Sequence, residues 1–223
     1  MTTINGIEIE KVKVEVREAT GFRVGAGVNV ANLSYVSKDE FGNEMLAKNA
    51  RSSPSLKYWV SVGYDLAKNP LAGRMVFRGD ISFSEAELTT NTHDYRYSSD
   101  IDIWHTFKQH NITLGLSGIY HLYNKEKIKI YIGSGGRLNF AFYQYDSEFN
   151  LTTETDPPIT DTFKLIDAEP RKLFFSVPFN AGIVLNKKIE LRIMYCLPAT
   201  LSHDNFIYKY DIRYFQGGLV YHF

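Results

Sequence analysis

Apolar and polar residues alternate with a period of two along most of the chain, a pattern typical of β-strands whose two faces meet different surroundings. Between residues 56 and 66 every even position is bulky and apolar, while most odd positions are polar or small. The same alternation marks eight segments, at residues 22–30, 56–66, 75–84, 112–122, 128–142, 173–185, 189–197 and 215–223. No helical period of comparable regularity occurs along the chain. We therefore predict an all-β fold with eight strands.

The connections between these segments are of two kinds. The short ones are turns built from Asn, Gly, Pro and Lys, at residues 67–73, 124–127 and 186–188. The others are longer and polar, at residues 36–54, 86–108, 146–171 and 199–206. Strict alternation of short and long connections predicts an antiparallel up-and-down transmembrane β-barrel with short periplasmic turns and long extracellular loops. Residues 101–108 either extend the fourth strand beyond the bilayer or form a separate strand, so ten strands are the alternative.

The polar face of these strands carries small residues, among them Gly25, Gly27, Ser61 and Gly63, interspersed with charge. A narrow eight-stranded interior needs small residues where side chains crowd, whereas a water-facing exterior does not. We therefore expect this face to line the lumen and the bulky apolar face to meet lipid, with aromatic girdles near both ends. The alternatives are a soluble lipocalin-like lipid carrier, with its apolar face inward, and a soluble β-sandwich.

Composition narrows the class of protein further. The chain has 223 residues with 25 Lys and Arg against 25 Asp and Glu, so its zero net charge gives no support for a nucleic-acid partner. A single cysteine, Cys196, excludes a disulfide framework and a Cys-rich zinc site. The first residues lack the basic and apolar stretches of a signal peptide, so we expect either a cytoplasmic chain or a processed form.

The end of the chain and two internal stretches resemble known outer-membrane proteins. Phe215, Leu219, Tyr221 and Phe223 share one face, which is similar to the C-terminal signal that the barrel-assembly machinery reads. The stretches GFRVGAGVNVANLSY (21–35) and KIKIYIGSGGRLNFAF (127–142) resemble the outer-membrane β-barrel domain common in Bacteroidetes, which includes small porin-like, OmpX-like and PorT-like proteins. The resemblance implies a location in the bacterial outer membrane, surrounded by its lipid. It covers residues 21–223 as a barrel domain, and we expect residues 1–20 to form a periplasmic extension.

The lumen-facing positions carry charges of both signs, mostly near the short-turn end. Opposite charges in a confined interior are expected to pair, because an unpaired buried charge is costly. We predict an ionic network made of Arg23, Asp65, Arg78, Asp80, Arg137, Glu190 and Arg192. Structural filling is one interpretation of this network. A gated anion path is the other, because basic residues outnumber acidic ones on this face.

The outer half of the lumen is expected to be less polar. Its inward positions include Trp59, Tyr143, Phe174 and Met194, together with Pro178 and Cys196. These residues either pack against one another or line a small apolar pocket for a lipid or hydrophobic solute.

Candidate catalytic chemistry is sparse. Ser202, His203 and Asp204 are the residue types of a hydrolytic triad, but adjacent residues on one loop rarely adopt triad geometry. His105 and His110 give a weak metal signal. We therefore expect no catalytic residue, metal or cofactor. The preferred hypothesis is a non-enzymatic outer-membrane protein whose external loops contact a surface or envelope protein, and the alternative is a porin-like or binding protein for a small hydrophobic or anionic solute.

Overall fold

The structure, a computed structural model, describes residues 3–4, 7–8, 21–37, 51–67, 74–96, 99–153, 160–164, 170–201 and 208–223. Its long strands are β3 (Gly21–Ser37), β5 (Ser55–Ala67), β6 (Met75–Arg96), β7 (Ser99–Asn124), β8 (Ile128–Thr153), β11 (Pro178–Leu185), β12 (Ile189–Thr200) and β13 (Tyr208–His222). The short strands are β1 (Thr3–Ile4), β2 (Ile7–Glu8), β4 (Arg51–Ser53), β9 (Thr160–Lys164) and β10 (Leu173–Ser176). No helix in these ranges is long and apolar enough to cross a membrane.

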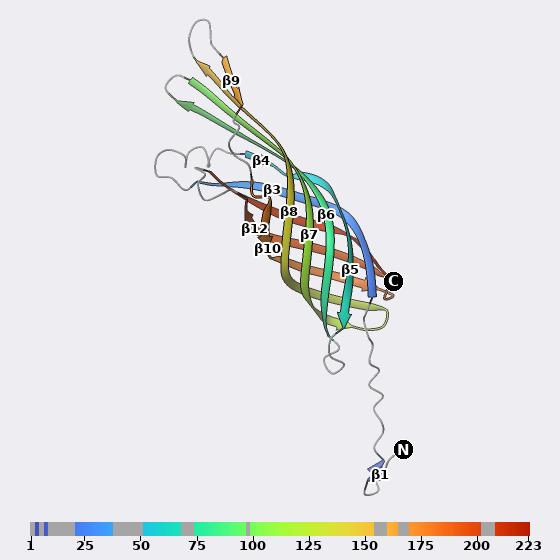
Figure 1. Cartoon of the computed structure of the whole chain (residues 1–223). Coiled ribbons are helices and arrows are strands. Elements are labelled where there is room, and N and C mark those ends of the chain that lie inside the picture. Colours follow the sequence, from blue (N-terminus) through green and yellow to red (C-terminus); the bar gives the residue numbers. More distant parts are fainter. Residues whose placement is uncertain are drawn as a thin grey trace.

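The long strands form a closed antiparallel ring (Figure 1). Each pairs with its neighbour in the chain, and β13 closes the ring by pairing with β3 from Tyr208↔Ser37 to His222↔Arg23. Strands β10 and β11 both pair with β8 and are separated only at Val177, so together they form one wall strand. The predicted eight-stranded barrel is confirmed, and the ten-stranded alternative is wrong.

Strands β6, β7 and β8 continue well past the rest of the barrel (Figure 1). The β6–β7 pairing runs without a break from Met75↔Tyr120 to Arg96↔Ser99. The prediction of a long polar loop at 86–108 is therefore wrong, and residues 101–108 extend the fourth strand. Strands β4 and β9 add to the margins of this external sheet by pairing with β6 and β8.

The prediction failed in the external sheet because the strict alternation of the lipid-facing strand ends there. Near the middle of β7 the outward, lipid-facing residues are even-numbered, such as Ile112 and Leu114. Between residues 101 and 107 the apolar residues are Ile101, Ile103, Trp104 and Phe107, which keep no single parity. Outside the bilayer neither face of a strand needs to be uniformly apolar, so the alternation that marks a lipid-facing strand is lost although the strand continues.

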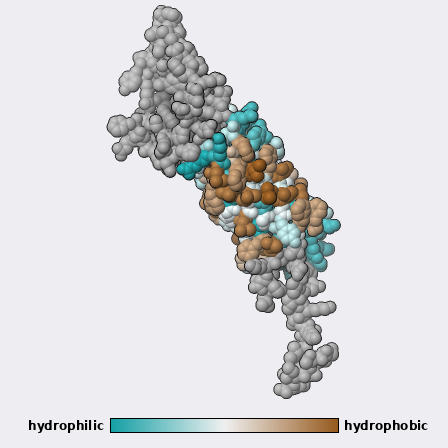
Figure 2. Space-filling view, in the orientation of Figure 1, coloured by the Kyte–Doolittle hydropathy of each residue, from teal (hydrophilic) through white to brown (hydrophobic). Residues whose placement is uncertain are grey.

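Bulky apolar residues cover the outside of the barrel, and polar residues fill its inside. Leu116 is 63% exposed and Phe175 is 61% exposed, whereas Arg23 and Glu190 are buried. Figure 2 shows the outer residues as a hydrophobic band with hydrophilic residues at both margins. A lipocalin-like carrier requires the opposite arrangement, so that alternative is wrong.

Small residues make room for the largest side chains of the lumen. An added Cβ at Gly25 or Gly218 would press on the Trp59 ring, at 3.1 and 2.8 Å. One at Gly182 would meet the Tyr131 ring carbon Cζ at 2.6 Å. Glycine is therefore needed at these positions by close packing across the narrow lumen.

Candidate functional site

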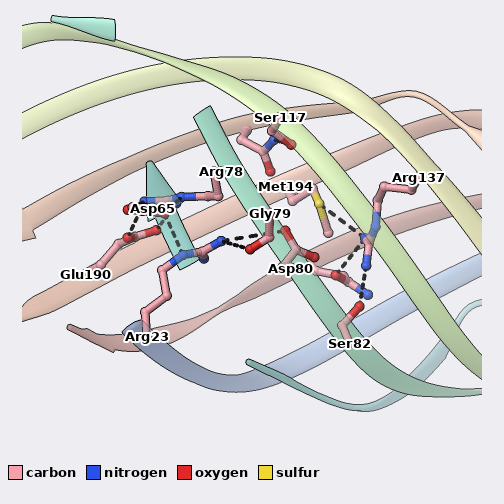
Figure 3. A network of polar contacts seen from close by, with 12 residues as sticks. Arg23, Asp65, Arg78, Gly79, Asp80, Ser82, Ser117, Arg137, Glu190 and Met194 are labelled. Carbon is pink, nitrogen blue, oxygen red and sulfur yellow. Dashed lines mark hydrogen bonds and ion pairs between the residues drawn. The ribbon is translucent and has the colours of Figure 1, made fainter. Parts of the chain in front are cut away.

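The lumen contains a cluster of buried ion pairs near its short-turn end. Arg78 is central, because its Nε and Nη2 donate to the two oxygens of Asp65 at 2.9 and 3.0 Å. Its Nη1 and Nη2 also donate to the two oxygens of Glu190 at 2.8 and 3.0 Å. Arg23 Nε donates to Asp65 Oδ1 at 2.7 Å. Four strands, β3, β5, β6 and β12, therefore meet through one network across the lumen (Figure 3).

Two residues that the sequence analysis did not single out complete this cluster. The hydroxyl of Tyr131 donates to Glu190 Oε1, and its ring lies 5.1 Å from the Arg78 guanidinium carbon. His222 Nε2 lies 2.6 Å from Glu190 Oε2. Tyr131 and His222 lie at positions whose side chains point into the lumen. Aromatic residues near strand ends are also typical of the girdles that face lipid, so residue type alone does not identify them as members of the cluster. The register between strands is also needed to show that both lie beside Glu190.

Asp80 and Arg192 lie beside the cluster and are held differently. Asp80 Oδ2 is 3.8 Å from Arg23 Nη2, a long ion pair. The Arg192 guanidinium lies over the Trp59 ring at 4.5 Å, and Trp59 Nε1 donates to the carbonyl of Gly217 at 3.2 Å. Trp59 therefore belongs with the charged part of the lumen, and the expectation that it joins the outer apolar residues is wrong.

Arg137 is apart from the ionic cluster. Its Nη2 donates to Ser82 Oγ at 2.6 Å, and its Nη1 to Gln216 Oε1 and Met194 Sδ, both at 3.3 Å. Its Nε is buried without a partner among the described residues. These hydrogen-bond partners of Arg137 are uncharged, and no ion pair links it to a carboxylate in the described part of the chain.

A chain of neutral hydrogen bonds crosses the lumen nearer its outer end. Asn111 Nδ2 donates to Tyr214 Oη at 3.1 Å, and the Tyr214 hydroxyl donates to Gln109 Oε1 at 2.9 Å. Gln109 Nε2 then donates to Tyr143 Oη at 3.1 Å, and the Tyr143 hydroxyl donates to the carbonyl of Arg171. These bonds satisfy polar groups that would otherwise be costly at this depth.

An apolar cluster fills the outer end of the lumen. Its buried members are Ala31, Leu33, Ala86, Leu88, Ala141, Phe174, Met194, Cys196, Ala199, Leu201, Ile212 and Tyr214, with Tyr143 packed against them. Three residues of the predicted apolar pocket, Tyr143, Phe174 and Met194, therefore come together here. Side chains therefore fill the lumen at two heights, with ion pairs near the short-turn end and apolar packing near the outer end.

Three of the predicted C-terminal signal residues lie on the outside of β13, and the fourth, Phe223, directly follows that strand. Phe215, Leu219, Tyr221 and Phe223 are exposed on the lipid-facing wall. The Phe223 ring lies 5.1 Å from Tyr221 and 5.8 Å from Phe22, and its backbone N–H donates to the Phe22 carbonyl at 3.0 Å. The last residue is thus joined to the first barrel strand.

The residues considered for catalysis or metal binding form no described site. Ser202, His203 and Asp204 lie outside the described residues, as does the side chain of His105. His110 stacks on Phe83 with ring centres 6.1 Å apart. Within the described part of the chain, no three His, Cys, Asp or Glu side chains group as metal ligands.

The closed ring, the lipid-facing exterior and the polar interior decide the type of protein. The chain is a small eight-stranded barrel of the outer-membrane type. No family model and no curated protein matches its sequence.

Solved structures of bacterial outer-membrane barrels are similar to the chain in fold. The outer membrane protein OprG from Pseudomonas aeruginosa is 12% identical, covers 92% of this chain and 97% of its own, and gives a TM-score of 0.49. Neisserial surface protein A is 15% identical over 91% and 97%, with a TM-score of 0.40. The attachment invasion locus protein of Yersinia pestis is 12% identical over 91% and 99%, with a TM-score of 0.35.

Proposed function

We propose that this barrel is non-enzymatic and acts through its external sheet, which contacts a partner on another surface or in an envelope complex. The observation that carries the proposal is the length of β6, β7 and β8, which have 22, 26 and 26 residues. About ten residues suffice to cross the bilayer as a tilted strand. In β7 the part beyond the lipid-facing Ile112 is roughly 40 Å long at ~3.3 Å per residue.

Regular pairing makes this projection an ordered platform. The β7–β8 pairing extends to Ser99↔Thr153, and β9 adds a further strand at Glu148↔Lys164 to Thr152↔Thr160. An ordered sheet loses less conformational entropy on binding than a long unpaired loop does. The lumen favours the same function, because its two filled levels oppose a wide diffusion path.

Shortening the external hairpin tests the proposal. Removing Thr89–Arg96 together with Ser99–Thr106 takes equal lengths from two paired strands and leaves Leu88, a member of the buried apolar cluster, opposite Phe107. The register and the lipid-facing band are kept, so the variant is expected to fold. Fluorescent vesicles carrying wild-type barrel should adhere to bacteria and to cultured epithelial cells several-fold more than vesicles carrying the shortened barrel. Equal adhesion would reject the external sheet as the contact surface.

An anion path through the lumen is a second candidate, and Arg137 is the observation that favours it. A buried cation whose hydrogen-bond partners among the described residues are uncharged can attract an anion more strongly than one that is already paired. In planar bilayers this candidate expects an anion-selective current that Arg137→Gln abolishes, while Arg213→Gln on the exposed outer part of β13 leaves it unchanged. A wild-type current equal to that of the bare bilayer would end this candidate.

The relation to the Bacteroidetes outer-membrane domain belongs to the same proposal. It is supported by the stretches at 21–35 and 127–142, which here form most of β3 and the membrane part of β8. The same proposal includes assembly of the barrel by the barrel-assembly machinery, which would read Phe223 as the terminal signal residue.

A further inference from the structure

Two basic turns lie side by side at the short-turn end of the barrel, which faces the periplasm in proteins of this type. The backbone N–H of Asn186 donates to the carbonyl of Lys127 at 2.8 Å, and Lys187 Nζ lies 2.9 Å from Glu126 Oε1. These contacts hold the β7–β8 turn against the β11–β12 turn. The exposed charged residues of the two turns are Lys125, Glu126, Lys127, Lys187 and Lys188. Lysines therefore exceed carboxylates in these two turns.

The lipid-facing wall above these turns is hollowed into an apolar groove. Its lower part has a volume of about 520 Å³ and its upper part about 660 Å³, and the two share Ile132, Ala181 and Ile193. The hollow forms where small residues replace bulky ones on the outside. Gly118 and Ser134 oppose each other in the β7–β8 pair, and Ala181 follows on β11.

The groove begins directly above the lysines. Its lower lining residues include Leu122, Ile130, Ile183 and Leu191. Each lies three residues from one of the two turns, which is about 10 Å along a strand. The groove continues to Ser134 and Phe179, roughly 23 Å along the strands from the turns. After strand tilt this corresponds to about 15–20 Å of depth, close to one leaflet of a ~30 Å hydrocarbon core.

We propose that this groove and the lysines beneath it bind an anionic phospholipid of the periplasmic leaflet. The phosphate and its negative headgroup lie against Lys125, Lys127 and Lys188, and one acyl chain lies along Ala181. Basic pockets at the margin of a membrane protein recognise anionic headgroups in this way. A zwitterionic phospholipid fills the apolar groove equally well but gains less from the lysines, so the site discriminates by charge.

Lipid binding to the refolded full chain in detergent tests the proposal by native mass spectrometry. Dioleoyl phosphatidylglycerol should bind the wild-type barrel about one order of magnitude more tightly than dioleoyl phosphatidylcholine. The triple variant Lys125→Gln, Lys127→Gln, Lys188→Gln should lose that preference. A matched triple variant at the opposite end, Lys57→Gln, Lys108→Gln, Arg213→Gln, should retain it.

A second pair of variants tests the groove. Ala181→Leu should reduce the occupancy of both lipids, because the added carbons fill the hollow. Gly79→Leu should not, because Gly79 is a β6 position where an added Cβ meets open space and which lies outside the groove lining. Variants are compared only as folded barrels, identified by their faster gel migration before boiling.

Salt dependence in the wild-type barrel provides a test that needs no variant. Raising the salt concentration from ~0.1 to ~1 M shortens the Debye length to about 3 Å and should remove most of the phosphatidylglycerol preference. The proposal is overturned if wild type shows no preference, if the preference resists salt, or if the periplasmic and external triple variants lose it equally. Equal lipid occupancy in Ala181→Leu and Gly79→Leu would overturn the assignment of the groove.

Discussion

At the residue scale, Glu190 and Arg78 show how a charge is kept inside a narrow barrel. Glu190 is fully buried, and its two oxygens contact Arg78, Tyr131 and His222. A buried carboxylate is tolerated only when donors replace the water it has lost. The cluster therefore links β6, β8, β12 and β13, and each hydrogen-bond partner offsets part of the cost of removing the Glu190 carboxylate from water.

Removing the charge of Glu190 tests this account. Glu190→Gln keeps the size of the side chain but leaves Arg78 with one carboxylate partner, so we expect the free energy of unfolding to fall by about 3–5 kcal/mol. Glu87→Gln is the matched control, because its pair with Lys57 (2.8 Å) is solvated and screened, so its loss should cost far less. Urea titration followed by gel mobility measures both. Similar losses in the two variants would contradict the structural importance of the buried cluster.

At the element scale, the wall strand formed by β10 and β11 has unequal neighbours. Strand β11 pairs with β8 on one side and with β12 on the other, from Pro178↔Cys196 to Leu185↔Ile189. Among the described strands, β10 pairs only with β8. Between β10 and β12 the backbone bonds are at the two flanks, from Leu197 N–H to the Val177 carbonyl and from Arg171 N–H to the Leu201 carbonyl. Pro178 and Pro198 lack the N–H donors that would extend this ladder.

Hydrogen exchange should report this difference. We expect the amides of β10 to exchange at least tenfold faster than those of β11 in the detergent-solubilised barrel, because one side of β10 lacks a continuous ladder. Peptides that cover 173–176 and 179–185 give the comparison by mass spectrometry. Equal amide protection of the two segments would contradict this expectation and would show that packing against the apolar cluster is enough to protect the amides of β10.

At the scale of the whole molecule, β13 and Phe223 lie at the seam where the barrel closes. Strand β13 pairs with β3 along its length, and Phe223 adds a backbone bond and a ring contact with Phe22 at the seam. Phe223 is also 74% exposed, so most of its ring remains available to another protein during assembly. The proposed role of Phe223 as an assembly signal therefore predicts that its loss affects recognition more than stability.

Deleting Phe223 should separate these two contributions. We expect the purified variant to refold in detergent with a free energy of unfolding within about 1 kcal/mol of wild type, since one exposed terminal residue is lost. In cells that export the chain to the outer membrane, the folded amount should fall several-fold. Phe175→Ala, which removes another exposed aromatic residue far from the C-terminus, is the control. Normal assembly of the Phe223 deletion would reject its role as a signal.

The sequence by itself determined the number of membrane strands, their antiparallel order and which face meets lipid. These features follow from strict alternation, from the spacing of turns and from glycines crowded on one face, all of which are local. The external extension is not marked by the same alternation, because the apolar residues of its outer part include both Ile103 and Trp104. Loss of alternation looks like the end of a strand, so the length of β7 could not be predicted from the pattern.

Only the tertiary structure decided which lumen residues meet. The alternation places Arg78, Arg137, Arg192 and Trp59 on the same inner surface, but their contacts differ. Arg78 pairs with carboxylates, Arg137 hydrogen-bonds to neutral groups, and Arg192 stacks on Trp59. Their partners come from strands distant in sequence, and the relative height of those strands is set by register and tilt around the closed ring. The groove above the basic turns arises in the same way, because its small residues lie on separate strands and become neighbours only when the barrel closes.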